Sequence, residues 1–276
     1  QNQIAGGNLL GSDGEGREFM RRLLQCEFYK TRRRYLFVTA LAITAIGLAW
    51  ATYGNYDGPS GAFMLENGWM AFLYQLPMLN AIFFPLLSIV IASRLADVEH
   101  KGGALKQLCA IAEKGRLYDA KLLYGLGIVL LAVLLHWLGL IVFGIVRGFG
   151  GTLPLRLYLL FLLFTILPTM AIYIIQHTLS LLYQNQAVSF FVGIIGTFAG
   201  LFSLFLPQVP LLRRFLPWGY YGTLQFVGMY GWTKETRYAD AYFALMDIDW
   251  LFFGVLVAAT VIVYFVGRKL FCEREV

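Results

Sequence analysis

The sequence predicts an all-α polytopic membrane protein with six transmembrane helices and an N-terminal interfacial helix. Its 276 residues are 59% hydrophobic and only 14% charged, whereas a soluble chain is roughly 45–50% apolar and about 25% charged. Five long windows contain no Asp, Glu, Lys or Arg, and one charge near the centre of a bilayer costs about 2.5–3.5 kcal/mol. This composition excludes a cytosolic enzyme, a disordered chain and a nucleic-acid-binding module.

The charge-free windows cover residues 35–53, 67–93, 122–146, 157–212 and 250–267. The fourth window is far longer than the ~20 residues that one helix needs to cross a bilayer. A polar cluster at 183–186 interrupts it, so we expect two helices joined by a tight hairpin. A single transmembrane domain over 20–276 then contains an outer loop at 207–249 and six spans, at about 34–53, 70–93, 121–146, 157–182, 188–206 and 250–269.

The segment before the first span has two parts. Residues 1–19 begin without Met and are rich in Gly and Asn, which indicates a flexible lead or an expression remnant. From 18 to 33, five apolar residues recur at helical spacing opposite basic ones, namely Phe19, Met20, Leu23, Leu24 and Phe28. This pattern predicts an interfacial amphipathic helix on the inner leaflet. The alternative is a charged tail that only orients the first span.

The distribution of basic residues predicts the orientation. With the N-terminus inside, 16 of the 22 Lys and Arg residues lie in inner segments, as the positive-inside rule requires. Both termini are therefore expected in the cytoplasm. The three cysteines, Cys26, Cys109 and Cys272, also lie on that side, where thiols stay reduced. Their odd number and wide spacing indicate neither a disulfide framework nor a metal site.

Energy-coupling chemistry is missing from the sequence. No Gly-x-x-x-x-Gly-Lys-Ser/Thr phosphate-binding loop is present, so the chain is not expected to hydrolyse ATP or to bind a cofactor of its own. Every Asp and Glu lies outside the spans, whereas ion-driven transporters usually carry such residues at membrane depth. Any uphill transport would therefore draw its energy from outside the bilayer.

A few polar and small residues lie at membrane depth. His136 and His177 could relay protons or sense pH, and the alternative is that both are simply packed polar residues. Gln75 and Asn80 either line a polar path or bond neighbouring helices. In the fifth span the small residues Gly196 and Gly200 allow close backbone approach, which serves either a dimer contact or packing within the chain.

The charged loop between spans two and three carries a set of short motifs. Glu99 is followed by Gly102, then by Lys106-Gln107-Leu108, and Tyr118-x-x-Lys121 opens the third span. On its residues alone, this loop either docks on a soluble partner or is a solvated connection. Together with the start Glu27-Phe28-Tyr29-Lys30, it resembles the inner loop of ABC-2-type transporter permeases, most closely the permease subunits of lantibiotic-immunity and bacteriocin-export transporters. Gly103 departs from that pattern, because relatives often carry a polar residue there.

The resemblance implies a six-helix, type V exporter-like half-transporter. A second permease, identical or related, would complete it, and two cytosolic ABC ATPase subunits would bind ATP and magnesium. The implied coupling helix covers 99–108, with ATPase-coupling residues Glu99, His100, Lys101, Gly102, Lys106 and Leu108. Spans two and five would line the substrate path, with Gln75, Asn80, Phe83, Phe84 and Thr197. No catalytic or metal-binding residue is expected, and the expected location is the bacterial cytoplasmic membrane.

The outer segment 207–249 is dense in aromatic residues, which favour the headgroup level. They would form a membrane belt or contact a ligand, and the resemblance implies short helices dipping back into the outer leaflet. The leading hypothesis is a transport subunit that exports or expels an amphipathic compound, such as an antimicrobial peptide. The alternatives are a stand-alone channel lined by Gln75, Asn80 and His136, or an intramembrane enzyme that uses His136 and His177.

Overall fold

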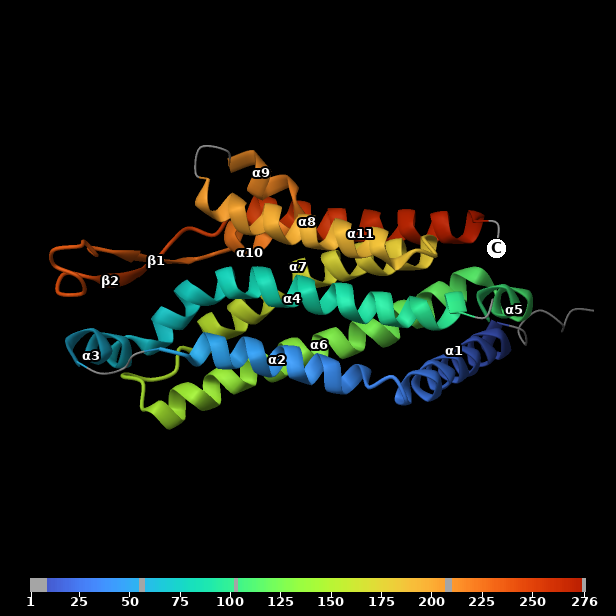
Figure 1. Ribbon diagram of the computed structural model, residues 1–276, viewed down its shortest axis with the longest axis horizontal. Coiled ribbons are helices and arrows are strands. Elements are labelled where there is room, and N and C mark those ends of the chain that lie inside the picture. Colours follow the sequence, from blue (N-terminus) through green and yellow to red (C-terminus); the bar gives the residue numbers. More distant parts are fainter. Residues whose placement is uncertain (1–8, 55–57, 102–103, 207–209, 275–276) are drawn as a thin grey trace, which may run out of the picture.

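The computed structural model describes residues 9–54, 58–101, 104–206 and 210–274. Long helices run along one axis and form an elongated bundle (Figure 1). Among the described residues, five helices are long and apolar enough to cross a membrane: α4 (Gly68–His100), α6 (Lys114–Arg147), α7 (Leu155–Leu182), α8 (Gln186–Phe205) and α11 (Trp250–Glu273). The predicted fold class, an all-α polytopic membrane protein, is confirmed.

The sixth candidate span is α2 (Leu36–Thr52), which follows α1 (Leu9–Arg32) after a bend of 73°. Tyr35 lies at this bend with φ at 54°, a left-handed conformation that stops a helix from continuing straight on. The bend separates a charged helix from an apolar one at the residues where the sequence predicts the change from interfacial helix to span.

The structure differs from the expected flexible lead at residues 9–19, which form the first turns of α1. Residues 1–8 lie outside the described part of the chain. Glu18 binds Arg21 at 3.0 Å and Arg22 at 3.1 Å. Opposite charges three and four residues apart lie on one face of a helix and stabilise it, which extends the amphipathic helix toward the N-terminus.

α4 and α6 are longer than the spans predicted within them. With 33 and 34 residues, each is about 50 Å long at 1.5 Å per residue, against about 30 Å for the hydrocarbon core of a bilayer. Both extend past the predicted spans toward α5 (Ala104–Ile111), a short helix between them. Most of the predicted inner loop 94–121 is therefore helical. We call this end of the bundle, with α1, α5 and the last turn of α11, the α5 end (Figure 1).

α4 is the central helix and packs against α2, α6, α7 and α8. The faces that point away from it are apolar and exposed, especially on α2, α8 and α11. Large side chains more than half exposed there include Leu41, Phe191, Ile195, Phe202, Leu251, Ile262 and Phe265. A soluble protein rarely exposes such a continuous apolar surface, so this surface is the one that meets lipid.

The opposite end, which we call the hairpin end, holds α3 (Gly58–Glu66) and a two-stranded antiparallel sheet (Figure 1). Strands β1 (Val227–Tyr230) and β2 (Tyr242–Leu245) pair with Val227 opposite Leu245. The Phe63 ring of α3 stacks on Tyr238 and Phe243 at centroid distances of 5.1 and 5.8 Å. The sequence did not predict this hairpin.

Three short helices precede the hairpin: α9 (Pro210–Phe215), η2 (Pro217–Gly219) and α10 (Tyr220–Thr223). They pack back against α4, α7 and α8, in the segment where short re-entrant helices were expected. Several aromatic residues assigned to a membrane belt are buried in the bundle instead, namely Trp218, Tyr220, Tyr221 and Phe226. Tyr230, Trp232 and Tyr242 remain exposed. Some of the aromatic residues of segment 207–249 therefore belong to the core of the bundle.

The small face of α8 receives Trp218. A Cβ atom at Gly196 would lie 2.5 Å from the Trp218 ring, and one at Gly200 would lie 2.7 Å from the Trp218 carbonyl oxygen. These two glycines thus pack against η2 within the chain, which is the internal-packing alternative. A dimer contact at Gly196 and Gly200 stays a prediction.

Gly200→Val is expected to lower the free energy of unfolding by about 1–3 kcal/mol, as overpacked sites do. The reason is that the new Cβ meets Trp218 backbone, which cannot rotate aside. Gly127→Val is the matched control, because a Cβ at this helical glycine meets nothing within 4 Å. Thermal unfolding in detergent measures both variants, and equal melting temperatures would contradict the packing described here.

Candidate functional site

α5 lies against the bundle through one face only. Leu105 and Ala112 at its two ends are buried, and Leu108 packs on the core. The opposite face carries Lys106 and Ile111, with Ile111 84% exposed. The exposed face of α5 is thus free of contacts with the described part of the chain, and it is available to another molecule. Of the predicted coupling residues, Lys106 therefore faces outward and Leu108 holds the helix in place.

The other predicted coupling residues are arranged differently. Glu99 is fully buried and is not accessible to a soluble partner in this structure. His100 lies with its Nε2 atom 3.0 Å from the carbonyl oxygen of Ser180 on α7. Lys101 is exposed and its Nζ atom donates to Asp97 at 2.7 Å. Gly102 lies outside the described residues. Their ATPase-coupling role stays a prediction.

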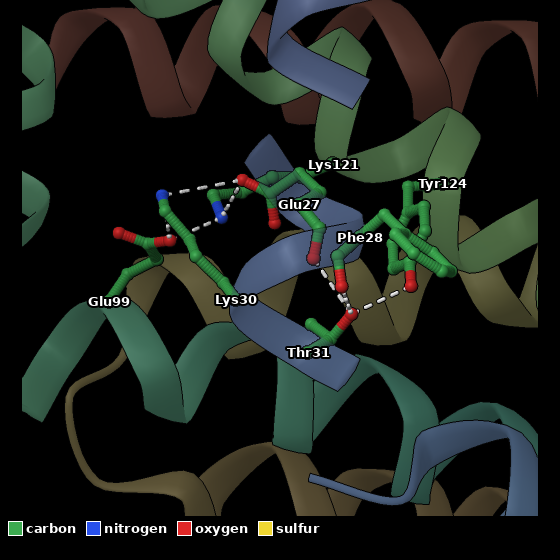
Figure 2. Close-up of polar contacts among 7 residues, drawn as sticks. All are labelled: Glu27, Phe28, Lys30, Thr31, Glu99, Lys121 and Tyr124. Atoms are coloured by element: carbon green, nitrogen blue, oxygen red, sulfur yellow. Dashed lines mark hydrogen bonds and ion pairs between the residues drawn. The ribbon is translucent and has the colours of Figure 1, made fainter. Parts of the chain in front are cut away.

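Glu99 belongs to a buried ion cluster, which we define as Glu27, Lys30, Glu99 and Lys121 (Figure 2). Lys121 of α6 is fully buried, and its Nζ atom donates to Oε1 of Glu27 and to Oε1 of Glu99, both at 2.7 Å. Lys30 Nζ lies 3.0 Å from the same Glu99 oxygen and 3.7 Å from Glu27 Oε1. The cluster thus joins α1, the end of α4 and the start of α6.

Two carboxylates and two ammonium groups make the buried ion cluster neutral. Burying a charge is costly unless an opposite charge and hydrogen bonds compensate for it, and the short contacts of Lys121 are charge-assisted hydrogen bonds. The second oxygen of Glu99, Oε2, is buried with no partner among the described residues. From the sequence, Glu27 and Lys121 are expected only as residues that carry the family resemblance. Their signal is a charge beside apolar residues: Lys121 directly precedes the charge-free window 122–146.

A second contact joins α1 to α6 beside the buried ion cluster. Thr31 Oγ1 lies 2.7 Å from the hydroxyl of Tyr124, and it also donates to the Glu27 carbonyl at 2.7 Å (Figure 2). Thr31 is buried, so this bond is shielded from solvent. The amphipathic helix is therefore fixed to the bundle at two adjacent positions, and does not merely rest on its surface.

The start of α6 is also bound to the C-terminal helix. Arg268 Nε donates to both carboxylate oxygens of Asp119 at 3.1 Å, and the Tyr264 hydroxyl donates to Asp119 Oδ1 at 2.9 Å. Lys114 Nζ donates to the carbonyl oxygen of Arg274 at 2.7 Å. Polar contacts at the α5 end thus join α1, α4, α6 and α11, and α5 itself packs against α4.

The predicted substrate-path residues do not line one path. Gln75 is exposed and lines a cavity at the hairpin end. Asn80 is buried and donates to Thr165 of α7 at 3.3 Å. Phe83 packs edge-on against Trp50 at 6.4 Å, and Phe84 packs against the His136 ring at 5.4 Å. Thr197 is buried and donates to a carbonyl oxygen of its own helix, at Gly193.

Both histidines at membrane depth are packed inside the bundle. His136 is 4% exposed beside Phe84, and His177 is 1% exposed beside Tyr118 and Tyr173. Within the described ranges, no cluster of three His, Cys, Asp or Glu side chains is arranged to hold a metal ion.

Comparison with protein families bears on this arrangement. The sequence matches the ABC-2 family transporter protein model over residues 23–200, which is more than half of the chain. The chain belongs to the ABC-2 family. No curated protein matches it. It is accordingly a multi-pass membrane subunit of an ABC transporter, and the family implies partnership with ABC ATPase subunits.

The match to the ABC-2 family covers most of the segments that form the α5 end. It contains all four residues of the buried ion cluster and all of α5, and it ends within α8. The short helices and the β-hairpin of 210–249 follow it, as does α11. The buried ion cluster and α5 thus lie inside the matched region, while the short helices, the β-hairpin and α11 lie outside it.

Proposed function

We propose that this ABC-2 protein is an export permease that expels an amphipathic substrate, such as an antimicrobial peptide, and that separate ATPase subunits drive it through α5. The observation that carries the proposal is the exposed face of α5, with Lys106 and the 84% exposed Ile111, on a junction braced by the buried ion cluster. A lantibiotic-immunity role would be one instance of this function.

The proposed mechanism follows from these contacts. The α5 end faces the cytoplasm, since most of the basic residues lie there, and both termini are cytoplasmic in a bacterial cell membrane. ATP and magnesium bind to the ATPase subunits. Closure of the ATPase pair displaces α5, and the buried ion cluster makes α1, α4 and α6 move together. A second permease, identical or related, forms the other half of the transporter.

Co-purification tests the ATPase partnership. The permease is expressed with the ATPase encoded beside it and isolated by an affinity tag. We expect the ATPase to co-purify at a stoichiometric level and its ATP hydrolysis to rise when the permease is present. A permease that moves a solute across ATP-free liposomes, with no ATPase bound even after crosslinking at α5, would contradict the proposal.

No observation favours the channel alternative over an exporter. Of its three proposed lining residues, Asn80 and His136 are buried in contacts between helices. Only Gln75 faces a cavity. An enzyme that uses His136 and His177 also lacks support, because both rings are enclosed by aromatic side chains.

A further inference from the structure

Two adjoining cavities lie at the hairpin end. Their charged lining residues, among those described, are Arg213, Arg214, Asp247 and Asp249, and none of these takes part in the contacts of the candidate functional site. The first cavity, about 550 Å³, lies between α2, α4 and α8. The second, about 440 Å³, lies between α9, α10 and the hairpin. Both are lined by Tyr74 and Gln225, so they adjoin at these side chains, and we treat them as two halves of one groove.

The first half of the groove, which we call the apolar half for its aromatic and aliphatic side chains, also contains Gln75 and Gln225 and lies beside the lipid-facing surface. Its walls include Trp50, Met78 and Phe205, all of them exposed. Gln225 Nε2, in the wall shared with the second half, donates to the carbonyl oxygens of Tyr74 at 3.2 Å and Val227 at 3.0 Å. An acyl chain can lie along the apolar side chains of this half.

The second half of the groove is charged. Arg214 and Asp249 form its fixed wall: Arg214 Nη2 donates to Asp249 at 3.3 Å, and the guanidinium lies 4.6 Å over the Phe252 ring. Arg213 and Asp247 line the same cavity. Within the described part of the chain neither has an ion-pair partner, and the Nε atom of Arg213 is buried without a hydrogen bond.

One unpaired cation and one unpaired anion in a single cavity fit a ligand that carries both charges. Arg213 can bind a phosphate, because guanidinium matches phosphate oxygens in geometry and charge, and Asp247 can bind an ammonium group. A polycationic peptide would meet two arginines here. The apolar half adds a place for a hydrocarbon chain, which a soluble zwitterion would leave empty.

From this combination we infer that the groove binds a zwitterionic phospholipid, with phosphate at Arg213, the amine at Asp247 and an acyl chain along Trp50 and Met78. The inference rests on the proposed function, for which it names the class of amphipathic substrate: a lipid of the ethanolamine type. The groove opens beside the bilayer surface of α2 and α8, so the lipid can enter sideways.

Native mass spectrometry of the purified full chain tests the inference. The chain in detergent is titrated with phosphatidylethanolamine, with phosphatidylglycerol, and with a cationic amphipathic peptide built of Lys and Leu. We expect one phosphatidylethanolamine per chain, retained about tenfold more strongly than phosphatidylglycerol, as loss of one charge-assisted contact would give. Equal retention of the two lipids, or displacement of the lipid by the peptide, would overturn it.

Variants place the bound lipid in the groove. Arg213→Gln and Asp247→Asn should each weaken phosphatidylethanolamine retention about tenfold, while Arg213→Lys should keep most of it. Lys234→Gln removes an exposed charge on the hairpin outside both cavities and should change nothing. Retention unchanged in both Arg213→Gln and Asp247→Asn would overturn the site. No ATPase takes part, so this result and the co-purification result can fail independently.

Discussion

Lys121→Met is expected to lower the free energy of unfolding by about 3–5 kcal/mol, the usual cost of removing one partner from a buried ion pair. The substitution leaves Glu27 and Glu99 buried with Lys30 as their one remaining cation in the buried ion cluster. It also removes the ion pair between α6 and Glu27 of α1, so that the Thr31–Tyr124 hydrogen bond remains as the polar contact described between these two helices. Unfolding in detergent, followed by melting temperature, measures the loss.

Two further variants make this prediction specific. Lys269→Met removes an equally charged side chain from an exposed pair with Glu273, and exposed pairs contribute roughly 0–1 kcal/mol. Adding Glu27→Gln to Lys121→Met restores the charge balance and should recover part of the stability. If Lys121→Met unfolds no more easily than Lys269→Met, the buried ion cluster does not hold α1 in place.

Ile111→Asp is expected to weaken binding of the ATPase at least tenfold, since a hot-spot side chain at the centre of an interface contributes about 2 kcal/mol or more. The side chain is 84% exposed, so the permease should melt at an unchanged temperature. Co-purification and stimulated ATP hydrolysis measure the effect. Ile111→Leu, which keeps an apolar side chain, is the control and should bind normally.

The contrasting variant on the other face of α5 is Leu105→Asp. Leu105 is buried, and a carboxylate there would destabilise the bundle itself. We thus expect Ile111→Asp to impair binding of the ATPase and Leu105→Asp to impair folding of the permease. Normal ATPase binding by Ile111→Asp would place the docking surface elsewhere.

Most of the helices could be predicted from the sequence because charge is excluded from the hydrocarbon core. Each charge-free window therefore located a span, and the break near 183–186 correctly separated α7 from α8. The ends of α4 and α6 were predicted too short, since charged residues beyond the bilayer continue both helices as far as His100 and from Lys114. Hydropathy locates the part of a helix that lies in the membrane, but it does not locate the residue at which the helix ends.

The arrangement of the candidate site was harder to predict. Lys121 binds Glu27, 94 residues earlier in the chain, and no local pattern says which charges meet. The surroundings of the predicted substrate-path residues were equally hard to predict: Gln75 faces a cavity, whereas Asn80 and Phe84 lie on faces of α4 that pack against α7 and α6. Their role in a substrate path stays a prediction. The hairpin was missed because its strands pair across a long aromatic loop, without a short turn signal.

Site-specific labelling can test whether α5 faces the cytoplasm and binds the ATPase. Ile111→Cys is placed in a chain whose Cys26, Cys109 and Cys272 are changed to Ser, and cells are treated with a membrane-impermeant maleimide. Cys109 is the native cysteine of α5. Burial raises the pKa of its thiol above the ordinary value, so this thiol is expected to react more slowly with the maleimide than an exposed cysteine at position 111.

We expect the cysteine at position 111 to react only after the membrane is permeabilised, and co-expressed ATPase to protect it from the maleimide. Labelling in intact cells would place α5 outside, and labelling that is indifferent to the ATPase would remove α5 as the docking surface. Either result would contradict the claim that this permease is driven through α5 by a separate motor.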